Sequence, residues 1–439
     1  LLKAGTEQLL FETLLTQLRE KGWLKARGRQ RTDSTHVLAA VRAMNRLECV
    51  VETMQYALNC LAVVAPAWLR EHRPAEWLDR YGPRADDYRM PKSKAEREQY
   101  AAVIGADGWG LLGDLFARDA PPWLREIPAV ETLRRVWVQQ YVCVADVLRW
   151  READSTPPSA LMLSSPSDTQ AHYARKRSTS WIGYKVHLTE TCEADQPHLI
   201  THVETTAAPA SDGDAVVPIH QALEKKALLP STQLVDTGYV EAKLLVKMSR
   251  DYAVDLYGPT RADYHWQAQA GRGFEAERFR LDWDQQQATC PAGKTSLSWT
   301  PAVDRGDNEV IKIKFSSTDC KSGPSRPLCT TAKSQRRTIT VRTQVAYEAL
   351  QAARQRQESE EFKEQYQQRA GVEGTLSQAV RAFGMRRARY LGHAKTHLQH
   401  LLTAAAINLV RSGEWLAETP RAATRNSHFA RLMTPPQPA

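Results

Sequence analysis

The chain has 439 residues, 42% of them apolar, with 12 Trp and 14 Tyr. This much apolar material excludes general disorder, and the length suggests two or three domains. The formal net charge of +9 suits a polyanionic partner without requiring one.

Residues 9–21 predict an amphipathic helix that ends at Gly22. The basic segment after it ends in a short β-branched run carrying Asp33, so we assign residues 1–36 to an N-terminal helix and a first core strand. From Val37 apolar residues recur every three or four positions to about Trp150, broken by prolines, which predicts a helical segment over 37–154. The chain begins LLKAG without Met, and we expect upstream sequence to be missing.

The period changes to two after the Ser- and Pro-rich loop 155–168. The runs WIGYKVHLTE and HLITHVETT predict a β-hairpin, and a helix is expected around 214–226. The run QLVD predicts a buried strand that ends at Asp236 and leads into a helix at 241–249. We assign residues 155–258 to the core strands of a mixed α/β sheet.

Residues 259–345 are polar, rich in Gly, Thr and Trp, and end in the β-like run RRTITVRTQ. They predict a β-rich insertion. Residues 346–412 are strongly helical in pattern, and residues 413–439 lack periodicity and predict a disordered tail.

The compartment is indicated by cysteine usage and by the apolar runs. Seven cysteines, an odd number, are too few for a disulfide scaffold and favour a reducing compartment. The longest apolar stretch, 58–69, contains Asn59 and Pro66 and is shorter than the roughly 20 residues of a membrane span. No secretory signal is visible, so we expect a cytoplasmic protein with no membrane segment.

Three acids stand out by their context. Asp33 and Asp236 lie at the ends of predicted strands, and strand ends in α/β sheets are where polar site residues emerge. An arbitrary Asp at such a position is more often a turn or N-cap residue. The third acid, Glu373, follows Tyr366 and Arg369 at i, i+3 and i+7, which places the three near one stripe of a helix.

The alternative for Glu373 is an ordinary solvated helix face, in which Arg369 and Glu373 form a weak pair. Gly371 and Gly374 flank the acid and each lowers helix propensity by roughly 1 kcal/mol relative to Ala. A simple surface helix therefore explains the segment less well.

Four motifs in order resemble bacterial insertion-sequence transposases of the DDE type: TDSTHV, SPSDTQAHYARKRSTSWIGYKVH, LVDTGYV and RAGVEGTLSQAVRAFGMRRARYLGHAKTHLQH. The last contains the end of the Y-x2-R-x3-E signature of one branch of that family. The resemblance spans about residues 5–411. It implies that Asp33, Asp236 and Glu373 are the catalytic and metal-binding D, D and E.

The resemblance also implies an α/β fold. It is an RNase H-like mixed sheet core with a large helical insertion after the first strand and a β-rich, cysteine-containing insertion before the C-terminal catalytic helix. Two Mg²⁺ (or Mn²⁺) ions are implied, and carboxylate oxygens are the ligands that such hard cations prefer. Without metal, the clustered acids should repel one another, so we expect some of them to have raised pKa values.

The implied function is a DNA transposase that cleaves and transfers strands at insertion-sequence ends. The implied partner is double-stranded DNA (terminal inverted repeats and target), in an active homodimer in the bacterial cytoplasm, associated with the nucleoid. Two alternatives stay open: a catalytically inactive transposase-derived DNA-binding protein, and a nuclease with the same metal cage. The sequence departs from the related E-x6-K pattern, because Val380 occupies the lysine position and Arg381 or Lys395 is left to replace it.

Basic residues cluster beside the third acid, with seven Lys or Arg and one acid between residues 369 and 411. A solvated helical face is the usual reading of such a run, but the scarcity of acids favours phosphate contacts. The hairpin region adds a second basic group, in which Tyr184 fits a core position equally well. The predicted DNA-binding residues are Tyr366, Arg369, Arg381, Arg386, Arg387, Arg389, Lys395, Lys176 and Lys185.

The other potential metal ligands are weaker candidates. Cys290, Cys320 and Cys329 resemble a zinc ribbon that has Gly323 in place of its fourth cysteine, so we interpret the segment as a degenerate ribbon and do not expect zinc. Asp168 reads as a turn residue, Asp214 as a helix N-cap, and Asp212 as a further rival acid. The histidines at 393, 397 and 400 read as exposed or hydrogen-bonded side chains.

Overall fold

The computed structural model describes residues 5–83 and 90–420, together with residues 2, 85, 429 and 432. Its centre is a six-stranded mixed sheet of β1 (Arg29–Leu38), β4 (His172–Lys176), β5 (Thr179–Thr191), β6 (Ile200–Ala207), β7 (Thr232–Leu234) and β8 (Asp255–Tyr257). The strand order is β4-β5-β1-β7-β8, and β6 also pairs with β5. β1 runs antiparallel to β5 and parallel to β7, and β7 runs parallel to β8. This mixed sheet is compatible with an RNase H-like core.

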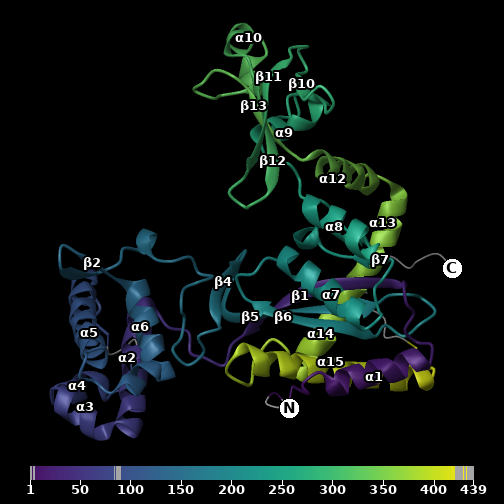
Figure 1. Cartoon of the computed structure of the whole chain (residues 1–439). Helices are drawn as coiled ribbons and strands as arrows, with labels where there is room; N and C mark the ends of the chain where they lie inside the picture. Colours follow the sequence, from purple (N-terminus) through teal and green to yellow (C-terminus); the bar gives the residue numbers. More distant parts are fainter. Residues whose placement is uncertain are drawn as a thin grey trace.

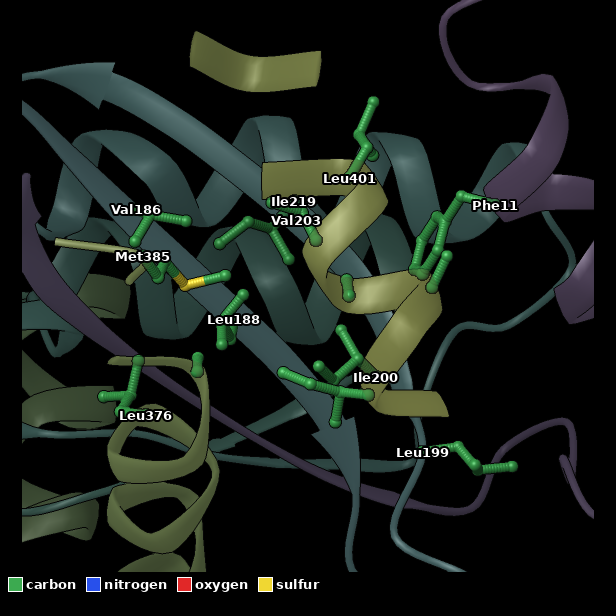
Figure 2. Packing of buried hydrophobic residues seen from close by; sticks show 14 of the residues in the cluster. Phe11, Val186, Leu188, Leu199, Ile200, Val203, Ile219, Leu376, Met385 and Leu401 are labelled. Atoms are coloured by element: carbon green, nitrogen blue, oxygen red, sulfur yellow. The ribbon is translucent and has the colours of Figure 1, made fainter. Parts of the chain in front are cut away.

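Four helices share the main hydrophobic core with this sheet: α1 (Leu9–Glu20), α7 (Val216–Lys225), α14 (Gly371–Phe383) and α15 (His393–Leu416). Figure 2 shows Phe11 of α1 and Leu401 of α15 near Ile200 and Val203 of β6. Leu376 of α14 belongs to the same core. The N-terminal helix and the C-terminal third of the chain are thus bound to one sheet, although they are far apart in sequence.

A smaller core lies around α8 (Ala242–Tyr252), which packs against β8 and against α12 (Gln344–Gln357). The chain then continues through α13 (Glu360–Gln367) into α14. Short 3-10 helices are η3 (Pro122–Glu126), η4 (Ala153–Ser155), η5 (Gly213–Ala215), η6 (Thr237–Tyr239), η7 (Ala276–Arg278) and η8 (Gln368–Ala370).

Between β1 and β4 the chain forms a helical body with its own hydrophobic core, on one side of the sheet in Figure 1. It consists of α2 (Arg46–Val64), α3 (Pro66–His72), α4 (Trp77–Tyr81), α5 (Lys94–Leu115), α6 (Pro128–Gln140) and the hairpin β2 (Tyr141–Val144) and β3 (Val147–Trp150). The predicted helix start at Val37 is wrong, because β1 continues along β5 to the pair Leu38–Gly183. α2 begins only after Asn45, whose side chain forms a capping box with Glu48. The hairpin was predicted as helix.

Within the described residues α2 alone is long and apolar enough to cross a membrane by length and composition, and half of its apolar window is buried in the helical body. Met54, Ala57 and Leu61 are fully covered there. Burial of this kind is typical of a core helix, so the helix is weak evidence for a span.

Residues 266–342 form a β-rich module that projects away from the sheet in Figure 1. Its elements are α9 (Trp266–Ala270), β9 (Arg280–Asp282), β10 (Gln287–Thr289), β11 (Ser296–Val303), β12 (Glu309–Phe315), α10 (Ser317–Ser322), α11 (Arg326–Cys329) and β13 (Thr338–Arg342). β11, β12 and β13 form an antiparallel sheet with β12 in the centre. The predicted β-like run before residue 345 is β13.

The other predicted elements are largely observed. The helix at 9–21, the hairpin of β5 and β6, and the helices near 214–226 and 241–249 are confirmed. The C-terminal segment is helical as predicted, except at 384–392. There the Leu38 N–H donates to the carbonyl of Arg386 and the Ala388 N–H donates to the carbonyl of Leu38, both at 2.8 Å. The predicted tail lies mostly outside the described residues, and its first residues continue α15 to Leu416.

Candidate active site

The first two acids are brought together by the pairing of β1 with β7. The parallel register ends two residues before Asp33 and two residues before Asp236. Asp33 therefore lies in the middle of β1, which continues along β5, and not at a strand end as predicted. Asp236 precedes η6, and its carboxylate accepts a hydrogen bond from the Thr237 N–H at 2.7 Å.

The third acid reaches the same place from a helix. Glu373 lies in the first turn of α14, and a cavity of about 530 Å³ is lined by all three acids. The acids that line it are Asp33, Asp236 and Glu373, and the basic residues that line it are Lys176, Arg177, Lys185, Arg369 and Arg386. Acids from three distant parts of the chain thus share one basic cavity.

Arg369 connects two of the acids. Its Nη2 lies 2.7 Å from Asp33 Oδ2, and its Nη1 lies 3.0 Å from Glu373 Oε1. The side chains of Arg369 and Asp33 are 13% and 16% exposed, whereas Glu373 is 65% exposed. The ion pair between Arg369 and Asp33 is therefore shielded from solvent, whereas the Glu373 side chain is free to move toward the solvent.

The electrostatics of Asp33 follow from its burial. Burial raises the pKa of Asp33 above the ordinary aspartate value, Arg369 opposes this, and the charge of Asp236 adds to it. The prediction that an acid of this cluster has a raised pKa is confirmed for Asp33. The main cause of the raised pKa is desolvation of Asp33, and repulsion by the Asp236 carboxylate contributes less.

The donor set suits a divalent cation, since three carboxylates line one cavity and hard cations prefer oxygen ligands. Among the described residues, no three His, Cys, Asp or Glu side chains already converge closely enough to hold an ion. The physical reason that the three acids do not converge is that the Arg369 guanidinium lies between the carboxylates of Asp33 and Glu373.

Two lysines of the cavity are held by a fourth acid. Lys185 Nζ lies 3.1 Å and Lys176 Nζ 3.9 Å from the carboxylate of Asp212, which also accepts a hydrogen bond from Ser34 Oγ at 3.1 Å. Arg386 Nε donates to Thr35 Oγ1 at 2.8 Å. Four of the nine predicted DNA-binding residues, Lys176, Lys185, Arg369 and Arg386, line the cavity.

The other five lie outside it. Tyr366 stacks on Phe362 with ring centroids 5.4 Å apart, and burial raises its pKa to about 12. Arg381, Arg387, Arg389 and Lys395 are exposed.

Two residues considered with this basic group have structural roles. Tyr184 is fully buried and donates its hydroxyl to Asp168, so it is a core residue. Arg411, counted in the basic run, is paired with buried Glu190 at 2.7 Å and is not available to phosphate.

Glu190 is the centre of a buried network that the sequence did not reveal. Its carboxylate accepts hydrogen bonds from Arg31 Nε at 2.7 Å, Arg411 Nη1 at 2.7 Å and Thr375 Oγ1 at 2.6 Å. Burial alone would raise its pKa, but the guanidiniums of Arg411 and Arg31 hold the pKa of Glu190 below its usual value. Because Thr375 lies in α14 two residues after Glu373, this network fixes the helix of the third acid to β1 and β5.

The rival acids have other roles. Asp168 is buried and accepts hydrogen bonds from the backbone N–H groups of Gln170 and Gly392, as expected of a turn residue. Asp214 is exposed and accepts from the Ser211 N–H, whereas Asp212 occupies the N-cap of η5, so the predicted N-cap at Asp214 is wrong. Neither Asp168 nor Asp214 lines the cavity.

The three histidines of α15 are hydrogen-bonded, as one of the two readings proposed. His397 Nδ1 and His400 Nδ1 lie 3.0 and 2.9 Å from Thr205 Oγ1, and His393 Nε2 lies 2.7 Å from the Thr205 carbonyl. They join α15 to β6.

The three cysteines of the β-rich module meet at a small cavity of about 60 Å³. Cys290, Cys320 and Cys329 line it, and Gly323, at the position of the absent fourth cysteine, lines it too. The structure thus brings the three predicted cysteines together around one cavity.

Residues 289–412 match the family model of the transposase DDE domain. The match contains Glu373, Arg369 and most of the β-rich module, while Asp33 and Asp236 lie outside it. No curated protein and no solved structure matches the chain. The match supports the resemblance stated above, and over residues 289–412 the chain is similar to the DDE domain of transposases.

Proposed function

We propose that the protein is a metal-dependent DNA transposase that cleaves strands at insertion-sequence ends and transfers them to target DNA. The observation that carries the proposal is the basic cavity shared by Asp33, Asp236 and Glu373. The match to the transposase DDE domain is separate support for the proposal. It does not depend on Asp33 and Asp236, which lie outside the matched residues.

In this proposal the carboxylates of Asp33 and Asp236 would hold one Mg²⁺ or Mn²⁺ ion, and Glu373 would contribute to holding a second. When bound, two such ions supply an activated hydroxyl nucleophile and stabilise the leaving oxygen of a phosphodiester. Glu373 has to leave its pair with Arg369 to join this site, and its 65% exposure leaves it room to do so.

The basic residues of the cavity bind and orient the DNA. Lys176, on the rim and 62% exposed, contacts a backbone phosphate, and Arg369, once released by the acids, turns to the scissile phosphate. Hydrolysis frees a 3′-hydroxyl, which attacks target DNA in the same cavity. The exposed residues Arg381, Arg387, Arg389 and Lys395 extend the phosphate-binding surface over α14, the segment 384–392 and the start of α15.

The proposal extends to the organisation of the chain. We assign the helical segment 37–154 and the β-rich segment 259–345 as insertions into an RNase H-like core, and 346–412 as the catalytic C-terminal part. The active complex is a homodimer on double-stranded DNA, in the bacterial cytoplasm.

The role of Arg369 can be tested by metal binding without catalysis. Replacing Arg369 by Gln is expected to lower the Kd for Mn²⁺ by roughly tenfold, about 1.4 kcal/mol, because the ion no longer has to displace a guanidinium from between two carboxylates. Free Mn²⁺ is measured by electron paramagnetic resonance during a titration.

Arg381→Gln is the matched control, since Arg381 is exposed on α14, the helix that carries Glu373, and forms no ion pair with a described residue. Its Kd should equal that of the wild type. Weaker Mn²⁺ binding by Arg369→Gln than by the control would show that the guanidinium supports the metal site.

The function itself is tested with a plasmid that carries the coding sequence and its flanking DNA on both sides. With Mg²⁺ we expect cleavage that leaves 3′-hydroxyl ends and, with a second plasmid, joined donor–target products. EDTA should abolish both. Cleavage without joining would identify a nuclease, and DNA binding without cleavage in Mg²⁺ or Mn²⁺ would identify an inactive derivative. Either result overturns the proposal.

A further inference from the structure

A second strongly basic region lies in the β-rich module, away from the cavity of the three acids. Residues 310–342 contain eight Lys or Arg and one acid, Asp319. Two of the eight are used within the module: Arg337 donates to the carbonyl of Cys329, and Arg342 pairs with Asp304 at 3.1 Å. The other six are Lys312, Lys314, Lys321, Arg326, Lys333 and Arg336, and none forms an ion pair with a described residue.

The alternation of β12 separates the lysines from the core. Ile311, Ile313 and Phe315 point into the hydrophobic cluster of the module, and the β9–β10 hairpin covers that side through Leu281 and Ala288. Lys312 and Lys314 point to the opposite side of the sheet. Around the two lysines this side is open to solvent, because Thr300, Thr338 and Thr340 on the neighbouring strands are exposed, whereas Val310 at the start of β12 is buried.

The strand register places these residues in rows across the sheet. Lys312 pairs with Thr300 on one side and Thr340 on the other, and Lys314 pairs with Thr338. We call Lys312, Lys314, Thr300, Thr338 and Thr340 the lysine face. Ammonium groups flanked by hydroxyl donors are the side chains that contact nucleic-acid phosphates.

The remaining basic residues extend the lysine face in one direction. α10 follows directly after β12, and β13 begins opposite Lys314, so the segment 316–337 lies at that end of the sheet. It carries Lys321, Arg326, Lys333 and Arg336. The acids Asp304, Asp307 and Glu309 lie at the opposite end, in and beside the β11–β12 turn. The charge therefore forms a gradient along the module.

We propose that the lysine face and segment 316–337 bind the phosphate backbone of duplex DNA, as a site separate from the catalytic cavity. The proposal rests on the proposed function for the choice of DNA as the polyanion. A DNA duplex fits because the surface offers positive charges and hydroxyl groups, and such groups contact backbone phosphates without reading the base edges. Since the module projects from the core sheet, the two sites would hold separate stretches of DNA (Figure 1).

The experiment compares Lys312→Gln/Lys314→Gln with wild type in EDTA, where cleavage is absent. Binding to a fluorescent duplex of arbitrary sequence is followed by anisotropy at several salt concentrations. Each lost phosphate contact lowers the slope of log K against log salt by about 0.9, so the slope should fall by about 2 and the affinity at 0.1 M salt by roughly tenfold or more. Both side chains lie outside the module's core, so circular dichroism should be unchanged.

The control removes two lysines elsewhere, Lys94→Gln/Lys247→Gln, which are 90% and 41% exposed and pair with nearby acids. Its slope should equal that of wild type. Equal slopes for the two double variants would overturn the proposal. So would a loss of poly-glutamate binding as large as the loss of DNA binding, because it would identify an acidic protein as the partner.

The two proposals can fail separately. If the lysine variant loses DNA affinity but the wild type cleaves no DNA in Mg²⁺, the proposed function fails and the DNA site stands. If cleavage and joining occur but the variant binds as the control does, the function stands and this site is wrong.

Discussion

Replacement of Asp33 by Asn is expected to slow DNA strand cleavage by roughly a thousandfold, about 4 kcal/mol of transition-state stabilisation, while DNA binding is kept. Asn has the shape of Asp but is a poor ligand for Mg²⁺, and the Ser34 N–H can still donate to its side-chain oxygen. Because burial already raises the pKa of Asp33, loss of its charge should cost little folding free energy. Cleavage is measured as released labelled strand at saturating DNA.

The same loss is expected for Asp236→Asn and for Glu373→Gln. Glu373 is the most informative of the three, because its 65% exposed side chain contributes little to packing, so unchanged thermal stability with lost cleavage points to the reaction. Asp214→Asn is the matched control, since Asp214 is exposed and lies outside the cavity. Full cleavage by all three acid variants would remove the catalytic assignment.

The position of Asp33 shows what local sequence can predict. A polar residue in a β-branched run was correctly assigned to a core strand, and the next run, from Val37, fits a helix and a strand equally well over so few residues. The strand continues because β5 pairs with it to Leu38 and because the segment around Arg386 bonds its end. Both partners are distant in sequence, so the register and the basic loop beside Thr35 could not be predicted.

Glu190 shows what local sequence cannot predict. A charged residue in an alternating run normally points to solvent, yet the Glu190 side chain is completely buried. Its partners Arg31 and Arg411 are 159 and 221 residues away, and neither stands in a motif. By contrast, Glu373 was found because the signature around it is local. The acids proposed as catalytic carry a sequence signal, whereas the network that fixes the helix of Glu373 does not.

Alanine substitutions at two glycines of α14 test this network, because they are expected to change the free energy of unfolding in opposite directions. At Gly371 an added Cβ would lie 2.1 Å from Arg31 Nη1, and at Gly374 it would meet no atom within 4 Å. Gly371→Ala is expected to destabilise the protein by about 2–4 kcal/mol, through overpacking and weakening of a buried ion pair. Gly374→Ala is expected to stabilise it by up to about 1 kcal/mol, the gain in helix propensity. Free energies of unfolding from urea denaturation measure both.

The reason for the difference lies in how Arg31 is held. Its side chain is 5% exposed and bonded to Glu190 and to the carbonyl of Gln368, so the guanidinium has no free direction in which to retreat. Gly371→Ala must therefore displace the start of α14, and Glu373 with it. We expect this variant to bind Mn²⁺ more weakly even below its unfolding transition, whereas Gly374→Ala should bind as wild type does. Equal stability of the two variants would mean that α14 is not fixed through Arg31, and the role assigned to the Glu190 network would be wrong.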